Sequence, residues 1–185
     1  MKPSKLLKDL VTSAIGAKAH FDMWWAQVNE ALPRFEREMN EHSDFFLACR
    51  AAHYTAFFVH IAHLFDKRAD SSSLPTYLNA IRNQTDPARM RILETRYASL
   101  SARAEPLLTI RHKTVAHIDA RLTEKDIFAP LNITWNEIRS IINDTTMFVT
   151  ELAGASQPGE VGIPRDGRLS EATIRLIGSL RSNKT

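Results

Sequence analysis

Apolar residues recur at helical spacing along almost the whole chain, and this periodicity constrains the possible folds more than any other feature. One helical face in the first third of the chain carries large apolar side chains three or four positions apart: Tyr54, Phe58, Ile61 and Phe65. Hairpin signals are missing, because the pair Asp166-Gly167 lies in a segment rich in proline and glycine and joins no alternating runs. The sequence therefore predicts an all-α protein.

Breakers and capping residues divide the first half of this pattern. We expect a first helix over residues 4–32, which Pro33 ends or bends, and a second helix over residues 34–66. The run DKRADSSSLP has the composition of a loop. After it, Ser72 or Ser73 is expected to cap a short helix through LPTYLNAIRN.

The second half begins with Asp86-Pro87, which predicts the start of a long helix because proline is favoured at the first helical position. Pro106 is expected to bend that helix. Thr134 and Glu137 have the spacing of a capping box, so the last core helix should begin there and end near Leu152.

The run GASQPGEVGIPRDG then predicts a linker, followed by an amphipathic helix with Ser170 as its N-cap. Its apolar positions exceed what a free tail needs, so we expect it to dock on the bundle or on a partner. The expected architecture is a bundle of four to five main helices over residues 1–153, with the linker and C-terminal helix over residues 154–185.

The length of 185 residues suits one domain with a sizeable core. The single cysteine, Cys49, excludes an intramolecular disulfide and a Cys-rich zinc module. Lys5, Lys8 and Asp9 interrupt what would be the apolar part of a signal peptide, and no uncharged run is long enough to span a bilayer. These features predict a cytoplasmic protein without a membrane segment.

Arginine makes up 16 of the 24 basic residues, although the formal net charge is only +3. Arginine suits planar, bidentate contacts with phosphate, which favours a nucleic-acid partner, while solvated arginines on helices are the alternative. Arg89, Arg96 and Arg103 recur every seven residues beside the apolar stripe of the long helix. We expect Arg96 and Arg103 to border a groove for a phosphate backbone, with a solvated flank as the alternative.

Several kinds of active site are excluded by the absence of their motifs. The chain has no HExxH or ExxH pair, no GxSxG elbow and no Gly-rich phosphate loop. His53, His60 and His63 lie on the second expected helix, where a metal site would need ligands from another helix. Half-buried, hydrogen-bonded histidines are the alternative, and we expect neither a metal nor a cofactor.

Residues 111–119, RHKTVAHID, match the needs of metal-free RNA cleavage. A base must activate the 2′-OH, an acid must protonate the leaving 5′-oxygen, and a cation must stabilise the phosphorane; His117 and Arg111 supply these functions. On one α-helix the two residues would be about 9 Å apart along the axis and about 120° apart in direction. This separation predicts that two copies converge across a symmetric dimer. A polar helix end, with cations favoured by the helix dipole, is the alternative.

With these residues in view, the sequence resembles the HEPN family, α-helical RNases of bacterial toxin–antitoxin and phage-defence systems. The HEPN motif is an arginine, four to six residues, and a histidine, commonly with a polar residue after the arginine. Here Arg111 is followed by His112, and five residues separate Arg111 from His117. Arg37 and His42 also match the spacing, but the surrounding EREMNEH is acidic and would repel RNA.

The resemblance extends to the branch tied to abortive infection and covers about residues 20–153. In that branch a helix ending in LFD, a short Ser-Leu helix and an RxKxxAH-type segment come in this order, as do HIAHLFDKRADSSSLPTYLNAI and RHKTVAHID here. It implies that Arg111 and His117 are the catalytic pair, with His112 as their polar neighbour. It implies further that Lys113 contacts phosphate, and that Asp119 orients an imidazole or caps the helix.

The resemblance also implies metal-independent cleavage of single-stranded RNA, a 2′,3′-cyclic phosphate product and a homodimer with the site at its interface. An antitoxin or another regulator is the further partner it implies. Some HEPN toxins carry a modified tyrosine two residues after the histidine; Asp119 occupies that position here, so we do not expect this control. The alternative is a non-catalytic helical module that binds RNA or a partner protein.

Overall fold

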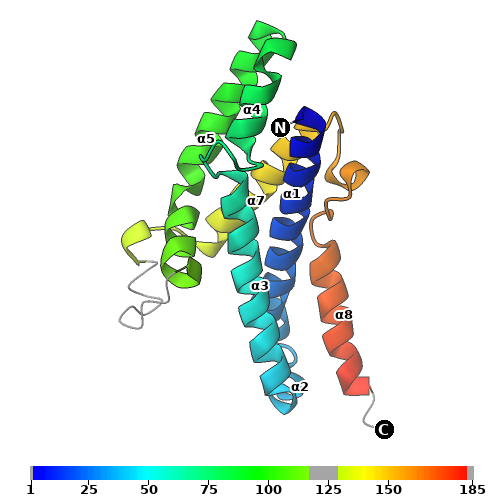
Figure 1. Ribbon diagram of the computed structural model, residues 1–185. Coiled ribbons are helices and arrows are strands. Elements are labelled where there is room, and N and C mark those ends of the chain that lie inside the picture. The colour runs from blue at the N-terminus through cyan, green and yellow to red at the C-terminus, as the bar shows by residue number, and fades with distance from the viewer. Residues whose placement is uncertain (1, 117–128, 183–185) are drawn as a thin grey trace.

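The computed structural model describes residues 2–116 and 129–182. This part of the chain consists of helices and connecting turns and contains no strand, which confirms the all-α prediction (Figure 1). The α-helices are α1 (Pro3–Trp25), α2 (Glu36–Glu41), α3 (Ser43–Leu64), α4 (Leu74–Ile81), α5 (Pro87–Arg111), α7 (Trp135–Leu152) and α8 (Arg168–Ser182). Two π-helical turns, η1 (Ala26–Ala31) and η3 (His112–Ala116), follow α1 and α5 directly. Short 3₁₀ turns are η2 (Arg82–Gln84), η4 (Ala129–Leu131) and η5 (Pro158–Val161).

The core forms where α1 packs along α3 and α7, while α5 packs against α3 and α7. Each helix contributes its apolar stripe, as periodicity predicts. The fully buried residues of α1 lie three or four positions apart: Leu6, Leu10, Ala14, Ala17 and Phe21. Those of α3 and α5 with no more than 4% exposure are Phe57, Phe58, Ile61, Leu64, Met90, Leu93, Leu100, Ala104, Leu107 and Ile110.

Capping residues set the helix starts that the sequence predicts. Asp86 precedes α5, and its carboxylate accepts a hydrogen bond from the backbone N–H of Arg89 at 2.9 Å. Before α7, Thr134 and Glu137 form the full capping box: the Thr134 hydroxyl accepts from the Glu137 N–H at 3.2 Å, and the Glu137 carboxylate accepts from the Thr134 N–H at 2.7 Å. α5 continues through Pro106 to Arg111.

The predicted end of the first helix near Leu32 is confirmed, because the helical segment runs to Ala31 with Leu32 as its C-cap, although its last six residues form the π-helical turn η1. Two other predicted helix boundaries are wrong. The expected second helix is broken at His42 into α2 and α3. Residues 40–45 around the break are all exposed, so no packing offsets the modest helix propensity of asparagine, histidine and serine. Ser170 is not an N-cap, because α8 begins at Arg168, directly after Gly167 at φ +80°. Ser170 is instead buried, and its hydroxyl donates to the Asp22 carbonyl at 3.3 Å.

The C-terminal segment docks back on the bundle, where α8 packs against η1, α1 and α2. A buried charge network holds the preceding linker: the Lys18 ammonium lies 2.7 Å and 2.8 Å from the two carboxylate oxygens of Asp22, and 2.7 Å from Asp166. The Lys18 and Asp22 side chains are each only 3% exposed. Asp166 also lies 3.4 Å from Arg139, so this network joins α1, the linker and α7.

A second charge contact holds the far end of α8. Arg181 donates from Nε to the Glu38 carboxylate at 3.0 Å and from Nη2 to the Arg34 carbonyl at 3.0 Å. Its guanidinium also stacks over the Phe35 ring at 5.0 Å. The hydrogen bond from Arg181 holds the pKa of Glu38 down at about 2.

We expect Arg181→Ala to lower the Tm of the protein at pH 7. Because the folded-state pKa of Glu38 is depressed, the stabilisation is fully present above the unfolded pKa near 4.5 and is lost as pH falls toward 2. The difference in Tm between wild type and variant should therefore shrink across that range, as thermal unfolding at several pH values would show. Arg175→Ala is the control, because Arg175 and its partner Glu171 are both highly exposed; an equal loss in both variants would contradict the expectation.

The outward face of α3 is apolar, and the described part of the bundle leaves it uncovered. It carries Phe45, Leu47 and Val59 at 63%, 56% and 41% exposure, with exposed Ala48, Ala51 and Ala52 between them. Among the described helices, α3 alone has the length and apolar composition of a membrane span, and 22% of that window is buried. Core helices of bundles meet the same two criteria, and α3 contributes Phe57, Phe58, Ile61 and Leu64 to the core.

Candidate nucleic-acid site between α3 and α5

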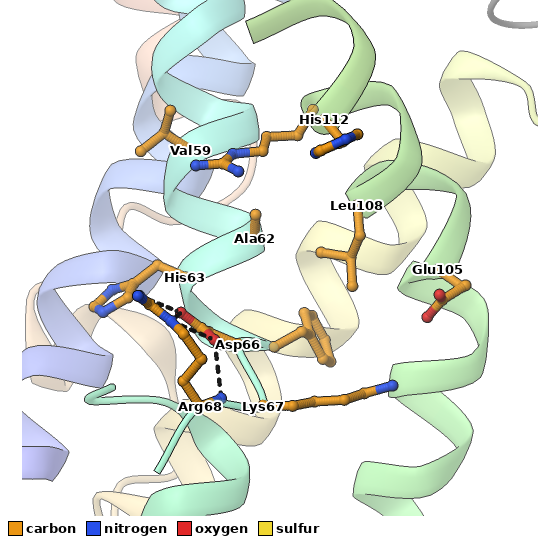
Figure 2. A pocket seen from close by; sticks show the side chains of 11 residues that line it. Val59, Ala62, His63, Asp66, Lys67, Arg68, Glu105, Leu108 and His112 are labelled. Carbon is orange, nitrogen blue, oxygen red and sulfur yellow. Dashed lines mark hydrogen bonds and ion pairs between the residues drawn. The ribbon is translucent and has the colours of Figure 1, made fainter. Parts of the chain in front are cut away.

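A cavity of about 600 Å³ lies between the C-terminal end of α3 and the last turns of α5 (Figure 2). The α3 wall and the turn after it supply Val59, Ala62, His63, Phe65, Asp66, Lys67 and Arg68. The α5 wall supplies Glu105, Leu108, Arg111 and the following His112. The cavity therefore brings the start of the RHKTVAHID segment against the LFDKR segment, which lies more than forty residues earlier in the chain.

Arg111 is the last residue of α5, and its position follows from the apolar stripe before it. Leu107 and Ile110 are fully buried in the core, which sets the rotation of the helix and turns Arg111 toward the cavity. The Arg111 side chain is half-buried, and its Nε has no hydrogen-bond partner within the described part of the chain. A buried guanidinium N–H without a partner is costly, and an anionic ligand in the cavity would satisfy it.

The chain changes from α- to π-helix at this point, so the expected geometry of one continuous α-helix through the motif is wrong. Residues His112–Ala116 form η3, and the Thr114 hydroxyl donates to the Ile110 carbonyl at 2.8 Å. Such hydroxyl contacts with the preceding turn compete with the backbone ladder and distort helices. π-helical turns are also frequent at functional sites. The predicted site residues His117 and Asp119 lie outside the described residues.

Of the other two described residues predicted from the motif, His112 lines the cavity and Lys113 does not. His112 is exposed and lines the cavity beside Arg111. Lys113 is half-buried and is not part of the cavity lining. The alternative interpretation of the motif is a polar helix end with cations favoured by the helix dipole. Arg111 lies in the last turn of α5 and so has this favourable placement. The same placement leaves Arg111 able to bind an anion.

Arg96 and Arg103 lie on the side of α5 that faces α7, away from the cavity lining. Arg96 and Arg89 both form ion pairs with Glu151. Arg103 lies 2.6 Å from Asp144 and donates to the Ser140 hydroxyl at 3.0 Å. These guanidinium groups are about half-exposed, so each is accessible to solvent while an acidic side chain of α7 balances its charge. Their role in substrate binding stays a prediction.

Sequence reasoning missed the residues on the opposite wall. Arg68 is tied to Asp66 by its backbone N–H at 3.0 Å and by its guanidinium at 2.8–3.2 Å (Figure 2). This contact lowers the pKa of the Asp66 carboxyl and raises that of Arg68. Lys67 is exposed between them. The available signal was the run DKR directly after an apolar helix, at the LFD element quoted for the HEPN branch.

The three histidines considered as metal ligands do not converge. His53 Nδ1 lies 2.9 Å from Nδ1 of His20, His60 stacks on His20 with ring centres 5.8 Å apart, and His63 Nδ1 lies 2.8 Å from the Ser13 hydroxyl. Burial lowers the pKa values of His20, His53 and His60. Within residues 2–116 and 129–182, no three potential ligands form a metal-binding group. The geometry agrees with half-buried, paired histidines between α1 and α3.

A comparison with protein families finds that the HEPN_AbiU2 model, described as AbiU2, matches residues 4–157. The match spans α1 to α7 and both walls of the cavity, and α8 lies beyond it. No curated protein and no solved structure matches the chain.

Proposed function

The chain belongs to the HEPN_AbiU2 family, a HEPN-type abortive-infection family, and from this premise we propose that it is a metal-independent endoribonuclease. It acts in the cytoplasm as a toxin or phage-defence effector and cleaves single-stranded RNA. The observation that carries the proposal is Arg111: a half-buried cation whose Nε has no partner among the described residues, at the wall of an open cavity and inside the HEPN motif. That environment suits a phosphate that becomes more negative as it reacts.

The chemistry needs only groups that the motif carries. A base takes the proton from the 2′-OH, the 2′-oxygen attacks phosphorus, and the 5′-oxygen leaves with a proton from the acid, so that a 2′,3′-cyclic phosphate forms. In the proposal His117 transfers protons, Arg111 stabilises the negative charge on the phosphorane, and His112 is the polar neighbour at the cavity rim. Lys113 contacts phosphate and Asp119 orients an imidazole.

The test is incubation of the purified protein with single-stranded RNA in EDTA, followed by analysis of the product ends. We expect cleavage with 2′,3′-cyclic phosphate ends, and no cleavage of the same strand when its 2′-OH groups are replaced by hydrogen. His117→Ala protein prepared in parallel reports any contaminating RNase. Intact RNA with the wild type, or dependence on an added metal ion, would refute the proposal.

We also propose that two copies complete the site as a homodimer through the exposed face of α3. This face is apolar and rich in alanine, which permits close helix packing, and it continues through Val59 and Ala62 into the cavity. A two-fold contact on α3 brings two cavities close together. The paired motifs then supply the acid, the base and two cations.

Ala52→Glu is expected to convert the dimer to a monomer and to reduce cleavage, because it places a charge in the middle of this face. Light scattering coupled to size exclusion measures the mass, and the cleavage assay measures the loss. Ile92→Glu is the control, since Ile92 is 58% exposed on α5 and lies outside the α3 face. A monomeric wild type, or a dimeric Ala52→Glu protein, would contradict the proposed interface.

A second candidate function is a non-catalytic module that binds a partner protein, such as an antitoxin or another regulator. The observation in its favour is an apolar cavity of about 450 Å³ between the start of α3 and α8, lined by His42, Phe45, Phe46, Leu176, Ile177 and Leu180. Phe45 and Leu176 there are more than 60% exposed, as is typical of contact surfaces. RNA binding without cleavage, or no binding of RNA at all, distinguishes this function from the nuclease.

A further inference from the structure

Lys67 is a cation of the cavity that no described residue neutralises. It follows the end of α3, is exposed, lines the cavity, and forms no ion pair within the described ranges. Its neighbour Arg68 differs, because the Asp66 carboxylate holds the Arg68 guanidinium in a bidentate contact. That contact fixes the turn that carries Lys67 and leaves Lys67 as the free positive charge on this wall.

The two walls of the cavity, α3 and α5, run in opposite directions (Figure 1). The end of α5 at Arg111 therefore lies beside the Val59 part of α3, while the turn after α3 lies beside an earlier part of α5. Figure 2 shows Val59 and His112 at one end and the Asp66–Arg68 turn at the other. The Lys67 side chain extends from that turn toward α5, on the side of Glu105. Arg111 lies six positions after Glu105, a rise of about 9 Å along α5.

Two cations separated in this way suit a polyanion with repeated charges better than a single small anion. A single strand within a duplex carries a charge about every 3.4 Å of the axis, so cations at opposite ends of the cavity contact different phosphates of one strand. We propose that Lys67 is a second phosphate-contacting residue and that the RNA backbone runs along the cavity from Arg111 to Lys67. This proposal rests on the proposed function. It adds the path of the RNA backbone along the cavity, which the HEPN motif alone does not specify.

Glu105 is expected to have the opposite effect from Lys67 on RNA binding. It is an exposed acid on the α5 wall between the two cationic ends, and it forms no ion pair with the described residues. The Glu105 carboxylate repels the phosphates of an RNA backbone that runs from Arg111 to Lys67. Removing the Glu105 charge should therefore strengthen RNA binding, while removing the Lys67 charge should weaken it.

The experiment measures binding of a fluorescent 2′-O-methyl RNA strand, which lacks the attacking hydroxyl and is not cleaved, over a series of salt concentrations. We expect Lys67→Ala to weaken binding and to reduce the slope of log K against log salt by about 0.7, the value of one phosphate contact to a single strand. Lys67→Arg should keep the slope, and Glu105→Gln should tighten binding. Lys8→Ala is the matched control, because Lys8 is an exposed lysine of α1 outside the cavity lining.

The outcomes separate the inference from the function on which it rests. If the wild type binds and cleaves RNA, but Lys67→Ala has the same slope as Lys8→Ala, the Lys67 contact is wrong and the nuclease stands. If the wild type binds with the expected slopes but does not cleave, the Lys67 contact stands and the nuclease is wrong. If the wild type does not bind the strand, both are overturned.

Discussion

Replacement of Arg111 by alanine is expected to lower kcat/KM for RNA cleavage by about 10²- to 10³-fold, the typical effect of removing one group that stabilises transition-state charge. His117→Ala should cost about 10²- to 10⁴-fold, because it removes proton transfer. The structure gives the physical reason for the first effect: Arg111 lies half-buried at the cavity wall, where its Nε has no partner among the described residues. A half-buried charge interacts more strongly with a negative phosphate than the more solvated charges elsewhere on α5 do, because less water screens it.

The sequence contains its own matched control for this experiment. Arg37 and His42 have an allowed HEPN spacing, but Arg37 is 3.5 Å from Glu38 and 3.9 Å from Glu41, and α2 ends before His42. Arg37→Ala and His42→Ala should therefore cleave RNA at the wild-type rate. Arg111→Lys should recover only part of the activity, because lysine lacks the planar fork. Equal rates for the Arg111→Ala and Arg37→Ala proteins would remove Arg111 from the mechanism.

Lys18→Met is expected to lower the free energy of unfolding by about 3–5 kcal/mol, because it leaves the Asp22 carboxylate buried without its partner. For a chain of this size, the Tm should fall by roughly 6–20 °C. Burial already raises the pKa of Asp22, and the Lys18 ammonium opposes that rise. Without Lys18 the pKa of Asp22 rises further, so the loss of stability should be greatest near neutral pH and should shrink as pH falls and Asp22 becomes protonated.

The paired replacement Lys18→Met with Asp22→Leu tests whether the loss comes from an uncompensated charge. Replacing both partners by apolar groups of similar size should recover most of the stability, as is common for buried ion pairs. Lys5→Met is the control, since Lys5 pairs with Asp9 at 2.6 Å with 64% of its side chain exposed. If Lys5→Met and Lys18→Met lower the Tm equally, or if the double replacement is as unstable as Lys18→Met, the account of this network is wrong.

Local features of the fold were predictable because they depend on residues within a few positions of one another. The cap at Thr134 and the start of α5 at Pro87 are confirmed. The boundaries at His42 and Ser170 were wrong for non-local reasons: exposed residues surround His42, and Ser170 is covered where α8 packs on the bundle. The π-helical turn after Arg111 also escaped prediction, because an apolar pattern does not distinguish it from an α-helix.

The sequence by itself determined that the chain is all-α, that it carries a HEPN motif at Arg111 and His117, and that a capped helix follows the motif. Periodicity, capping and motif spacing are properties of neighbouring residues, so they are visible without coordinates. Only the tertiary structure decided what faces the motif. The Asp66–Arg68 turn meets the end of α5 because α3 and α5 bury their apolar stripes against each other, and Lys18 reaches Asp166 across 148 residues because α8 covers α1. Contacts between distant segments depend on packing, which no local pattern specifies.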